Sequence, residues 1–358
     1  MPLSKIQGIE GQVTPNLGRR NLIINGAMQV AQRGTSLSIS PNENVYIVDR
    51  FKLFTYAMDQ LTGTFAQVSD APSGFANSLK WTTGTAESAI TDSEYHSIEY
   101  NIEAQDLQRL EQGSSTAKTI TLSFWVKSSV ADDFGVSIYK PDEAGSLSTR
   151  VVNPTYTINS ANTWEYKTIT ILGDTDSSGG ITLDNGIGLT LSWGIGCGPV
   201  YSGTPNTSWG AYSNPTWLGS QTQSTVTTTS GATWQITGIQ LEVGDTDTPF
   251  EHRSFGEELA ACQRYYYSNI NLGNNRLQFD TYVTSGIYPG INLTHPTTMR
   301  ANPTIAKVGS WTGSNIDQSS LSLNANVTSV TLQADATGTG RGYLYPNVNG
   351  GFSCDAEL

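Results

Sequence analysis

The chain has 358 residues, of which only 14% are charged, with 19 Lys and Arg against 31 Asp and Glu. The resulting net charge of −12 disfavours nucleic acid and anionic lipid head groups as partners, because both are themselves negative. With 8 Trp, 16 Tyr and 10 Phe, the composition excludes a disordered chain. No apolar run approaches the ~20 residues of a membrane-spanning helix, so membrane insertion is not expected.

Residues 1–20 have no hydrophobic period and no apolar segment, so they are predicted to be an arm for attachment or oligomerisation, not a secretory signal. Period-two strand patterns follow, separated by Gly, Ser, Asn and Asp. Many short strands at this spacing predict a jelly-roll β-sandwich over residues 21–252. The predicted strands include 45–55, 93–103, 119–128, 134–140, 150–157, 164–172, 187–195 and 233–243.

One short helix is predicted to close this β region. Ser254 and Glu257 have the spacing of a capping box, in which each side chain bonds the other residue's backbone N–H. A connecting helix is therefore expected within 253–267, and a weaker helical pattern lies at 104–111. Further alternating segments predict a smaller β-sandwich domain over residues 268–358. Those segments are 276–284, 287–293, 320–324, 328–334 and 352–358.

The three cysteines, Cys197, Cys262 and Cys354, lie far apart and include no CxxC pair. This pattern argues against a disulfide framework and against a zinc site. The expectation is three reduced, buried thiols in a chain that folds in a reducing cytoplasm.

No catalytic or cofactor motif is recognisable. His96, His252 and His295 fall in different segments, and neither a GxSxG elbow nor a phosphate-binding loop is present. The loop 174–180 resembles a calcium loop but lacks the glutamate that closes one, so it is expected to be a solvated turn. No catalytic residue, metal or cofactor is predicted, although carboxylate pairs such as Asp245 and Asp247 leave acid–base chemistry open.

The segment 185–241 contains no Asp, Glu, Lys, Arg or His, and its middle, 197–229, is rich in turn residues. Exposed aromatic faces among amides and hydroxyls suit a sugar ring, whose C–H face stacks while its hydroxyls form hydrogen bonds. The same rings could instead fasten the loop to its own domain or to a neighbouring subunit, and both interpretations remain open. The candidate carbohydrate-binding residues are Tyr201, Trp209, Tyr212 and Trp217.

Several separated blocks of the sequence resemble a known family. Residues 21–35 (NLIINGAMQVAQRGT) and 46–51 (YIVDRF) resemble the opening of tail-fibre and tail-appendage proteins of bacteriophages. Residues 234–245 (WQITGIQLEVGD), 248–259 (TPFEHRSFGEEL) and 262–266 (CQRYY) are similar to the end of the same module. The block 119–128 (TITLSFWVKS) is also similar to carbohydrate-binding jelly rolls. The resemblance covers roughly residues 20–267, and 268–358 match more weakly.

This resemblance implies a virion protein, made in the host cytoplasm, that projects from the tail and recognises host-surface polysaccharide. Such fibres are commonly homotrimers that contact other virion tail proteins, and the family supplies no catalytic mechanism. The first 20 residues are shorter than the anchoring domain of the best-known short-tailed-phage fibres. That departure leaves a purely structural tail adaptor or head decoration as an alternative. A glycan depolymerase is disfavoured, since the stacked short repeats of a parallel β-helix are not visible.

Overall fold

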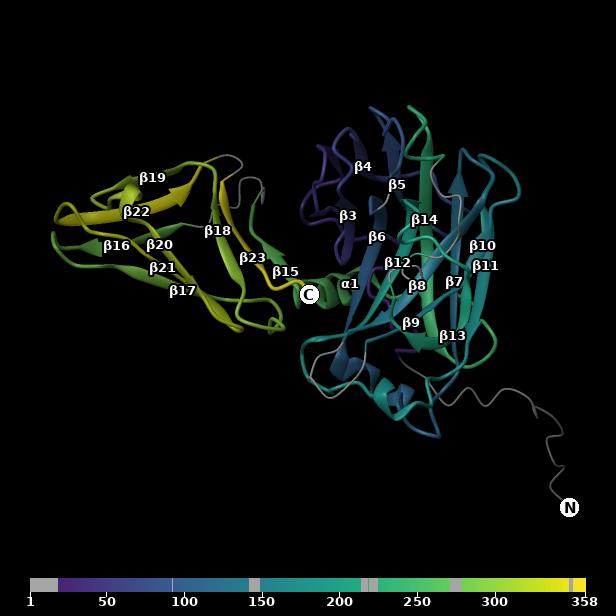
Figure 1. The fold of residues 1–358 in the computed structure, drawn as a ribbon. Helices are drawn as coiled ribbons and strands as arrows, with labels where there is room; N and C mark the ends of the chain where they lie inside the picture. Colours follow the sequence, from purple (N-terminus) through teal and green to yellow (C-terminus); the bar gives the residue numbers. More distant parts are fainter. Residues whose placement is uncertain are drawn as a thin grey trace, which may run out of the picture.

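The computed structural model describes residues 19–91, 93–141, 149–213, 218, 225–270, 278–347 and 350–358. Figure 1 shows a large β-sandwich, a short helix and a smaller β domain that extends away from the sandwich. The predicted all-β class, with a jelly-roll sandwich followed by a helix and a smaller β domain, is confirmed. In the described residues no helix is long and apolar enough to span a bilayer.

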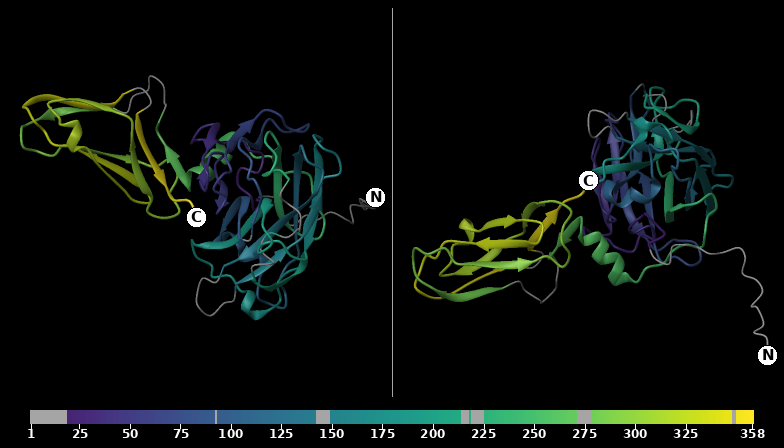
Figure 2. Two further views of the ribbon diagram at one scale, coloured as in Figure 1. Left: turned by 45° about the horizontal axis from the view of Figure 1, so that its top comes forward. Right: turned by 90° about the horizontal axis from the view of Figure 1, so that it is seen from below.

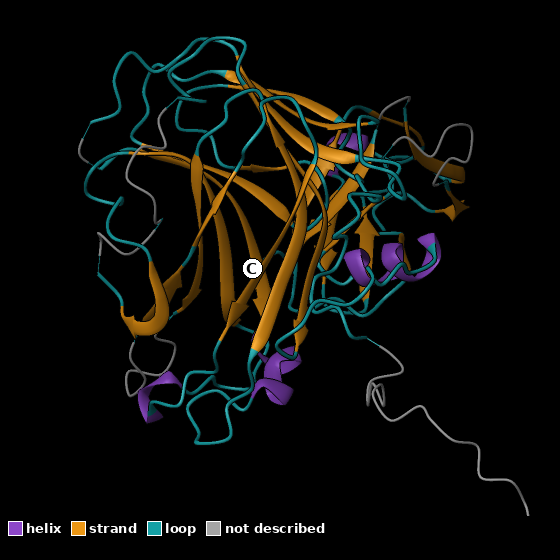
Figure 3. Ribbon diagram, turned by 90° about the vertical axis from the view of Figure 1, so that its right-hand side faces the viewer, coloured by secondary structure: helices purple, strands orange, loops and turns teal. Residues whose placement is uncertain are grey.

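The sandwich consists of two antiparallel sheets that face each other across one core (Figure 3). The six-stranded sheet has the order β1-β4-β5-β14-β7-β11, and the eight-stranded sheet has the order β13-β9-β8-β12-β6-β3-β2, with β10 paired to β8. Most neighbours are not consecutive in the chain, as jelly-roll crossovers require. The six-stranded sheet comprises β1 (Ser36–Ile39), β4 (Gly63–Val68), β5 (Ser78–Thr83), β7 (Ile120–Ser128), β11 (Glu165–Ile171) and β14 (Thr233–Val243). The eight-stranded sheet comprises β2 (Val45–Tyr46), β3 (Phe51–Tyr56), β6 (Tyr95–Glu103), β8 (Asp133–Lys140), β9 (Arg150–Asn153), β10 (Thr155–Thr157), β12 (Ile187–Cys197) and β13 (Asn206–Ala211).

Large aromatic side chains fill the space between the two sheets. Trp81, Trp193 and Trp234 are fully buried there together with aliphatic residues from every central strand. The predicted alternation of 164–172 is confirmed in β11, where Tyr166 is exposed and Ile171 is buried. Each sheet buries one face, so the alternate apolar residues of its strands pack together in a single core.

Three predicted elements differ from the structure, and one of them, 150–157, forms the two strands β9 and β10 on either side of Pro154. The segment 45–55 forms two strands, β2 and β3, because the chain turns between them at Arg50, whose φ of 74° is left-handed. The helical pattern at 104–111 forms the 3₁₀ helix Ala104–Leu110. This helix packs its two leucines and Ala104 inward and is too short for more than two turns.

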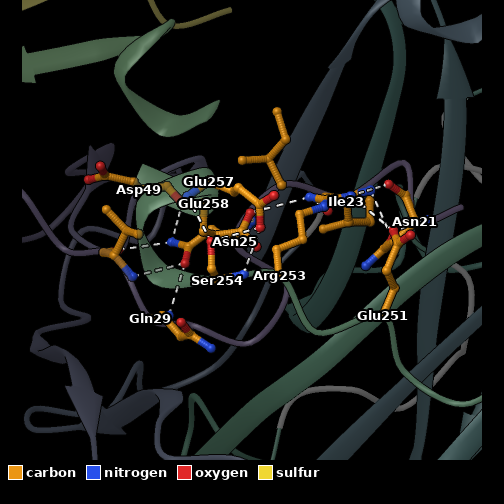
Figure 4. A network of polar contacts seen from close by, with 12 residues as sticks. Asn21, Ile23, Asn25, Gln29, Asp49, Glu251, Arg253, Ser254, Glu257 and Glu258 are labelled. Carbon is orange, nitrogen blue, oxygen red and sulfur yellow. Dashed lines mark hydrogen bonds and ion pairs between the residues drawn. The ribbon is translucent and has the colours of Figure 1, made fainter. Parts of the chain in front are cut away.

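Helix α1 (Phe255–Gln263) follows the sandwich, and its predicted capping box is present. The Ser254 hydroxyl accepts from the Glu257 N–H at 3.3 Å, and the Glu257 carboxylate accepts from the Ser254 N–H at 3.0 Å. Glu258 of the same helix accepts from the Asn25 backbone N–H at 2.5 Å (Figure 4). The helix is therefore held against the start of the sandwich.

The C-terminal domain contains three three-stranded sheets, β15-β23-β18, β16-β22-β19 and β17-β21-β20 (Figure 2). Its core includes Met299, Trp311, Leu344 and Phe352 and is separate from the core of the sandwich. The strands are β15 (Tyr266–Ser268), β16 (Phe279–Val283), β17 (Gly290–Thr294), β18 (Thr304–Val308), β19 (Trp311–Ser314), β20 (Ser322–Ala325), β21 (Ser329–Gln333), β22 (Gly340–Pro346) and β23 (Gly351–Asp355). A 3₁₀ turn, Gln318–Ser320, lies between β19 and β20, and another, Ser177–Gly179, lies between β11 and β12 of the sandwich.

The last residues of the chain lie against the eight-stranded sheet. The Arg50 guanidinium pairs with Glu357, and Arg33 lies 3.1 Å from the Asp355 carboxylate. The Asn101 amide of β6 donates to the Leu358 carbonyl oxygen at 2.9 Å. All three cysteines are buried and none forms a disulfide, as predicted.

Candidate functional site

The eight-stranded sheet turns one face away from the core, and this outer face carries the candidate site. Leu53, Ile98 and Trp193 point into the core, so their alternate neighbours Lys52, Glu99 and Ser192 point outward. Cross-strand pairing aligns Lys52 with Glu99, Glu99 with Ser192, and Ser192 with Ser137. The register of β9 and β10 on β8 places Asn153 beside Ser137. The five residues form a row across five strands, here called the polar strip.

Part of the polar strip lacks hydrogen-bond partners. The Ser137 and Ser192 hydroxyls and the Asn153 amide nitrogen are buried without a partner in the described structure. Buried polar atoms in native proteins are almost always hydrogen-bonded, and each unpaired one costs about 1–3 kcal/mol. Three such atoms lie side by side in the polar strip, where they are enclosed and not open to solvent, so they mark a local cost to stability on this face.

Glu99 gives the polar strip its electrostatic character. Burial raises the pKa of Glu99 to about 7, while the positive charge of Lys52 and a hydrogen bond from Ser97 act in the opposite direction. The Lys52 ammonium lies 4.7 Å from the Phe54 ring, a cation–π distance. Near neutral pH the carboxyl group can therefore either donate or accept a hydrogen bond.

Aromatic rings gather on the same face, toward the ends of β3 and β6. Tyr95 stacks on Phe54 at 5.4 Å and on Tyr56 at 5.6 Å, and Tyr201 meets the Tyr95 ring edge-on at 5.0 Å. Tyr56 is 48% exposed, which leaves part of its ring open to a ligand. Phe54, Tyr56, Tyr95 and Tyr201 are called the tyrosine platform below.

The structure brings two of the four predicted carbohydrate-binding residues to this face. Tyr201 belongs to the tyrosine platform, and Tyr212 packs edge-on against Tyr139 of β8, with ring centroids 5.5 Å apart. Trp209 lies apart from them, because its indole N–H donates to the Leu172 carbonyl at 2.9 Å and its ring packs on the core of the sandwich. Trp217 lies outside the described residues. A role of these residues in carbohydrate binding stays a prediction.

Sequence reasoning did not identify Phe54, Tyr56 and Tyr95 as candidate site residues. Phe54 and Tyr56 alternate with core residues along β3, so their outward direction could have been inferred from the period of the strand. Their contact with Tyr95 depends on the pairing of β3 with β6, which local sequence does not encode.

Two other residues considered from the sequence, Asp174 and His96, are buried within the fold. Asp174, expected in a solvated turn, is buried and pairs with the Arg150 guanidinium, whose second nitrogen lies 2.8 Å from the same carboxylate. His96 is enclosed between the sheets, and burial lowers its pKa to about 3. In the described part of the chain, no three His, Cys, Asp or Glu residues lie close enough together to hold a metal ion.

No protein-family model and no curated protein matches the chain. Solved structures similar to it include the enzymatically active domain of tailspike protein 4 of bacteriophage CBA120, at 12% identity and a TM-score of 0.35. That match covers 63% of this chain and 22% of the tailspike chain. The CBM22-2 xylan-binding domain of Paenibacillus barcinonensis Xyn10C is 17% identical, with 54% of this chain and 91% of that chain covered at a TM-score of 0.30. A family 11 carbohydrate-binding module from Clostridium thermocellum, in complex with a mixed-linked tetrasaccharide, is 13% identical, with coverages of 60% and 99% and a TM-score of 0.29.

Proposed function

We propose that this protein is a non-enzymatic, glycan-binding component of a bacteriophage tail, a fibre that contacts polysaccharide on the host surface. The observation that carries the glycan-binding part is the tyrosine platform, in which a half-exposed Tyr56 ring is supported from behind by Tyr95. A ring fixed in this way offers an apolar face to the C–H side of a sugar without a further loss of conformational entropy.

The surroundings of the tyrosine platform suit an uncharged, hydroxyl-rich ligand. The polar strip on the same face is neutral apart from Lys52 and Glu99, and its buried Ser137, Ser192 and Asn153 side chains include atoms without a partner among the described residues. The segment 185–241, which supplies Tyr201 and Tyr212, contains no ionisable side chain other than Cys197 and its tyrosines. Stacking surfaces combined with neutral hydrogen-bonding groups are the usual means of holding a saccharide.

The placement in a virion tail rests on the sequence blocks 21–51 and 234–266, which resemble phage tail fibres. In that setting a homotrimer would bury side surfaces and protect edge strands such as β2 and β11, and other tail proteins would hold the fibre. The alternative is a purely structural tail adaptor or head decoration, in which the loop 197–229 packs on a neighbouring protein.

Adsorption of fluorescently labelled protein to host cells tests the proposal, with light scattering of the same sample to determine the oligomeric state. Tyr56→Ala removes the open ring and is expected to weaken adsorption about three- to tenfold, the loss of roughly 0.5–1.5 kcal/mol of ring contact. Tyr166→Ala is the matched control, because Tyr166 is 40% exposed on the opposite sheet and packs on Trp125.

A trimer whose binding is lost after surface glycan is stripped from the cells would support an adhesin. Equal adsorption by Tyr56→Ala and wild type would show that the tyrosine platform is not part of the binding site. A protein that does not bind cells but assembles with isolated tails would instead be the structural adaptor.

A further inference from the structure

A hollow lies at the end of β6 opposite the tyrosine platform, where the 3₁₀ helix Ala104–Leu110 meets the start of the sandwich. It has a volume of about 260 Å³. Its charged lining consists of the guanidinium groups of Arg19, Arg109 and Arg253 and a single carboxylate, Asp106. Arg19 and Arg253 also line an adjoining hollow of about 640 Å³ beside α1, whose other charged residues are Arg264, Glu251 and Glu257. The two hollows and these four arginines are called the arginine groove.

The smaller hollow has more basic than acidic side chains in its lining, in a protein that carries 19 basic against 31 acidic residues. Arg253 and Arg264 are held in place by protein partners. Arg253 donates to the Asn21 and Ile23 carbonyls and lies 3.3 Å from Glu258 (Figure 4). Arg264 forms two hydrogen bonds with Glu103, at 2.9 and 2.7 Å.

The other two arginines form no direct ion pair in the described structure, although the charges of Glu251 and Asp106 act on Arg109. In the described structure no carboxylate lies within 4.0 Å of Arg19 or Arg109, and Arg109 donates only to the Arg20 carbonyl, at 3.0 Å. Burial lowers the pKa of Arg109, Glu251 and Asp106 act to raise it, and the charges of Arg19 and Arg253 lower it further. A partly buried guanidinium beside two others is stabilised by an anion, for which its fork of N–H donors is shaped.

We propose that the arginine groove binds the carboxylate of an acidic sugar residue, of the uronic-acid class. The volume of the smaller hollow, about 260 Å³, is large enough for a single sugar ring. Gln105 and Gln108 line it beside the arginines; their amide nitrogens donate to Glu103 and to the Gln105 carbonyl, and amide oxygens of this kind can accept from ring hydroxyls. Arg19 and Arg109 bind the carboxylate, and Arg253, fixed by its own partners, adds to the positive field.

This site is distinct from the tyrosine platform. Tyr95 and Glu103 are the two ends of β6, so the platform and the groove lie about 26 Å apart at ~3.3 Å per residue. Binding at the groove can therefore be lost while neutral-glycan binding at the platform remains, and the two proposals can fail separately.

The test is calorimetric titration of the full chain with trigalacturonate, and with galactotriose as the neutral counterpart. Arg19→Gln, which removes no side-chain hydrogen bond or ion pair of the described structure, and Arg109→Gln are each expected to weaken trigalacturonate binding about tenfold, as the loss of one charge-assisted hydrogen bond predicts. Arg341→Gln is the matched control, because this exposed arginine of the C-terminal domain is paired with Asp280. Wild-type affinity should also fall as salt is raised from 50 to 500 mM, as ionic screening requires.

Loss of trigalacturonate binding in both variants, with wild-type binding by Arg341→Gln, would establish the site. Equal affinity of Arg19→Gln, Arg109→Gln and wild type would overturn it, and so would an absence of trigalacturonate binding by the wild type. Thermal unfolding of each variant shows whether Arg109→Gln is folded, and Arg19→Gln decides the question if it is not. Self-association that depends on Arg19 and Arg109, without sugar binding, would also overturn the proposal and make the groove a protein contact.

Discussion

The two outer faces of the sandwich differ in how their polar groups are satisfied. On the six-stranded sheet, Asp70 pairs with Lys127 and accepts a hydrogen bond from Trp164 at 3.3 Å. Glu242 on the same sheet accepts hydrogen bonds from three donors, supplied by Gln240 and Thr248. On the eight-stranded sheet, the fully buried Ser137 and Ser192 hydroxyls have no partner among the residues that the structure describes. The first face is completed by its own chain, whereas the second encloses hydroxyls that the described residues leave without a partner.

The same contrast appears in the titration of the carboxylates. Hydrogen bonds from Lys127 and Trp164 lower the pKa of Asp70 at the six-stranded sheet, against the opposing effect of burial. Burial raises the pKa of Glu99 in the eight-stranded sheet to about 7. A carboxylate whose ionised form is stabilised by its neighbours contributes to stability. A carboxylate whose ionised form is disfavoured by burial is a candidate for function.

The largest expected effect comes from breaking the completed face at Glu242. Glu242→Ala leaves the Thr248 N–H and the Arg20 guanidinium without their buried partner and should lower the free energy of unfolding by about 3 kcal/mol. Urea unfolding monitored by tryptophan fluorescence measures this loss. Seven of the eight tryptophans precede the C-terminal domain, which contains only Trp311, so the signal reports mainly on the sandwich. A loss below ~1 kcal/mol would contradict the view that this face is stabilised by its own network.

The pH dependence of stability should separate wild type from Glu99→Gln. The pKa of Glu99 rises from an ordinary 4.5 to about 7, so between these values the folded state holds a proton that the unfolded state has released. This contribution is present below pH 4.5 and is lost as the pH rises, at up to ~1.4 kcal/mol per pH unit. The free energy of unfolding of Glu99→Gln should therefore increase relative to wild type from pH 4.5 to 7. Parallel profiles of the two proteins would show that Glu99 is solvated.

Removing an unpaired hydroxyl should stabilise the face that the chain leaves incomplete. Ser192→Ala deletes a buried group with no partner and should raise the free energy of unfolding by about 1 kcal/mol. The comparison substitution is Thr237→Val on the six-stranded sheet, where the hydroxyl donates to the Asn77 carbonyl at 2.8 Å, and it should destabilise by a similar amount. If Ser192→Ala is also destabilising, the hydroxyl is satisfied by ordered water.

The smallest effect is expected at the exposed ion pair between Lys127 and Asp70. Asp70 is about half exposed, and surface pairs of this kind contribute roughly 0–1 kcal/mol. Lys127→Ala should therefore change the urea midpoint only slightly, and less at high salt than at low salt. A loss as large as that of Glu242→Ala would show that the network on this face acts as one cooperative unit.

Much of the local structure could be predicted from short stretches of sequence. The capping box of α1 needs only Ser254 and Glu257, and the alternation of β11 needs only neighbouring residues. The candidate site could be predicted only in part. Tyr201 lies on the outer face as part of the tyrosine platform, whereas the Trp209 indole N–H donates a hydrogen bond to the Leu172 carbonyl. Whether an aromatic residue in an uncharged loop stacks on a ligand or on its own domain depends on which strand lies beneath it.

The sequence by itself determined the all-β class, the position of the helix between two β regions and the uncharged character of the loop 197–229, because periodicity, capping and composition act over a few residues. Tertiary structure alone decided that Phe54 of β3, Tyr95 of β6 and Tyr201 would share one surface. It also decided that Arg19, Arg109 and Arg253 would line one hollow. Jelly-roll crossovers pair strands that are distant in the chain, so contacts of this kind follow from the register of the sheets and the packing of the core, not from local propensity.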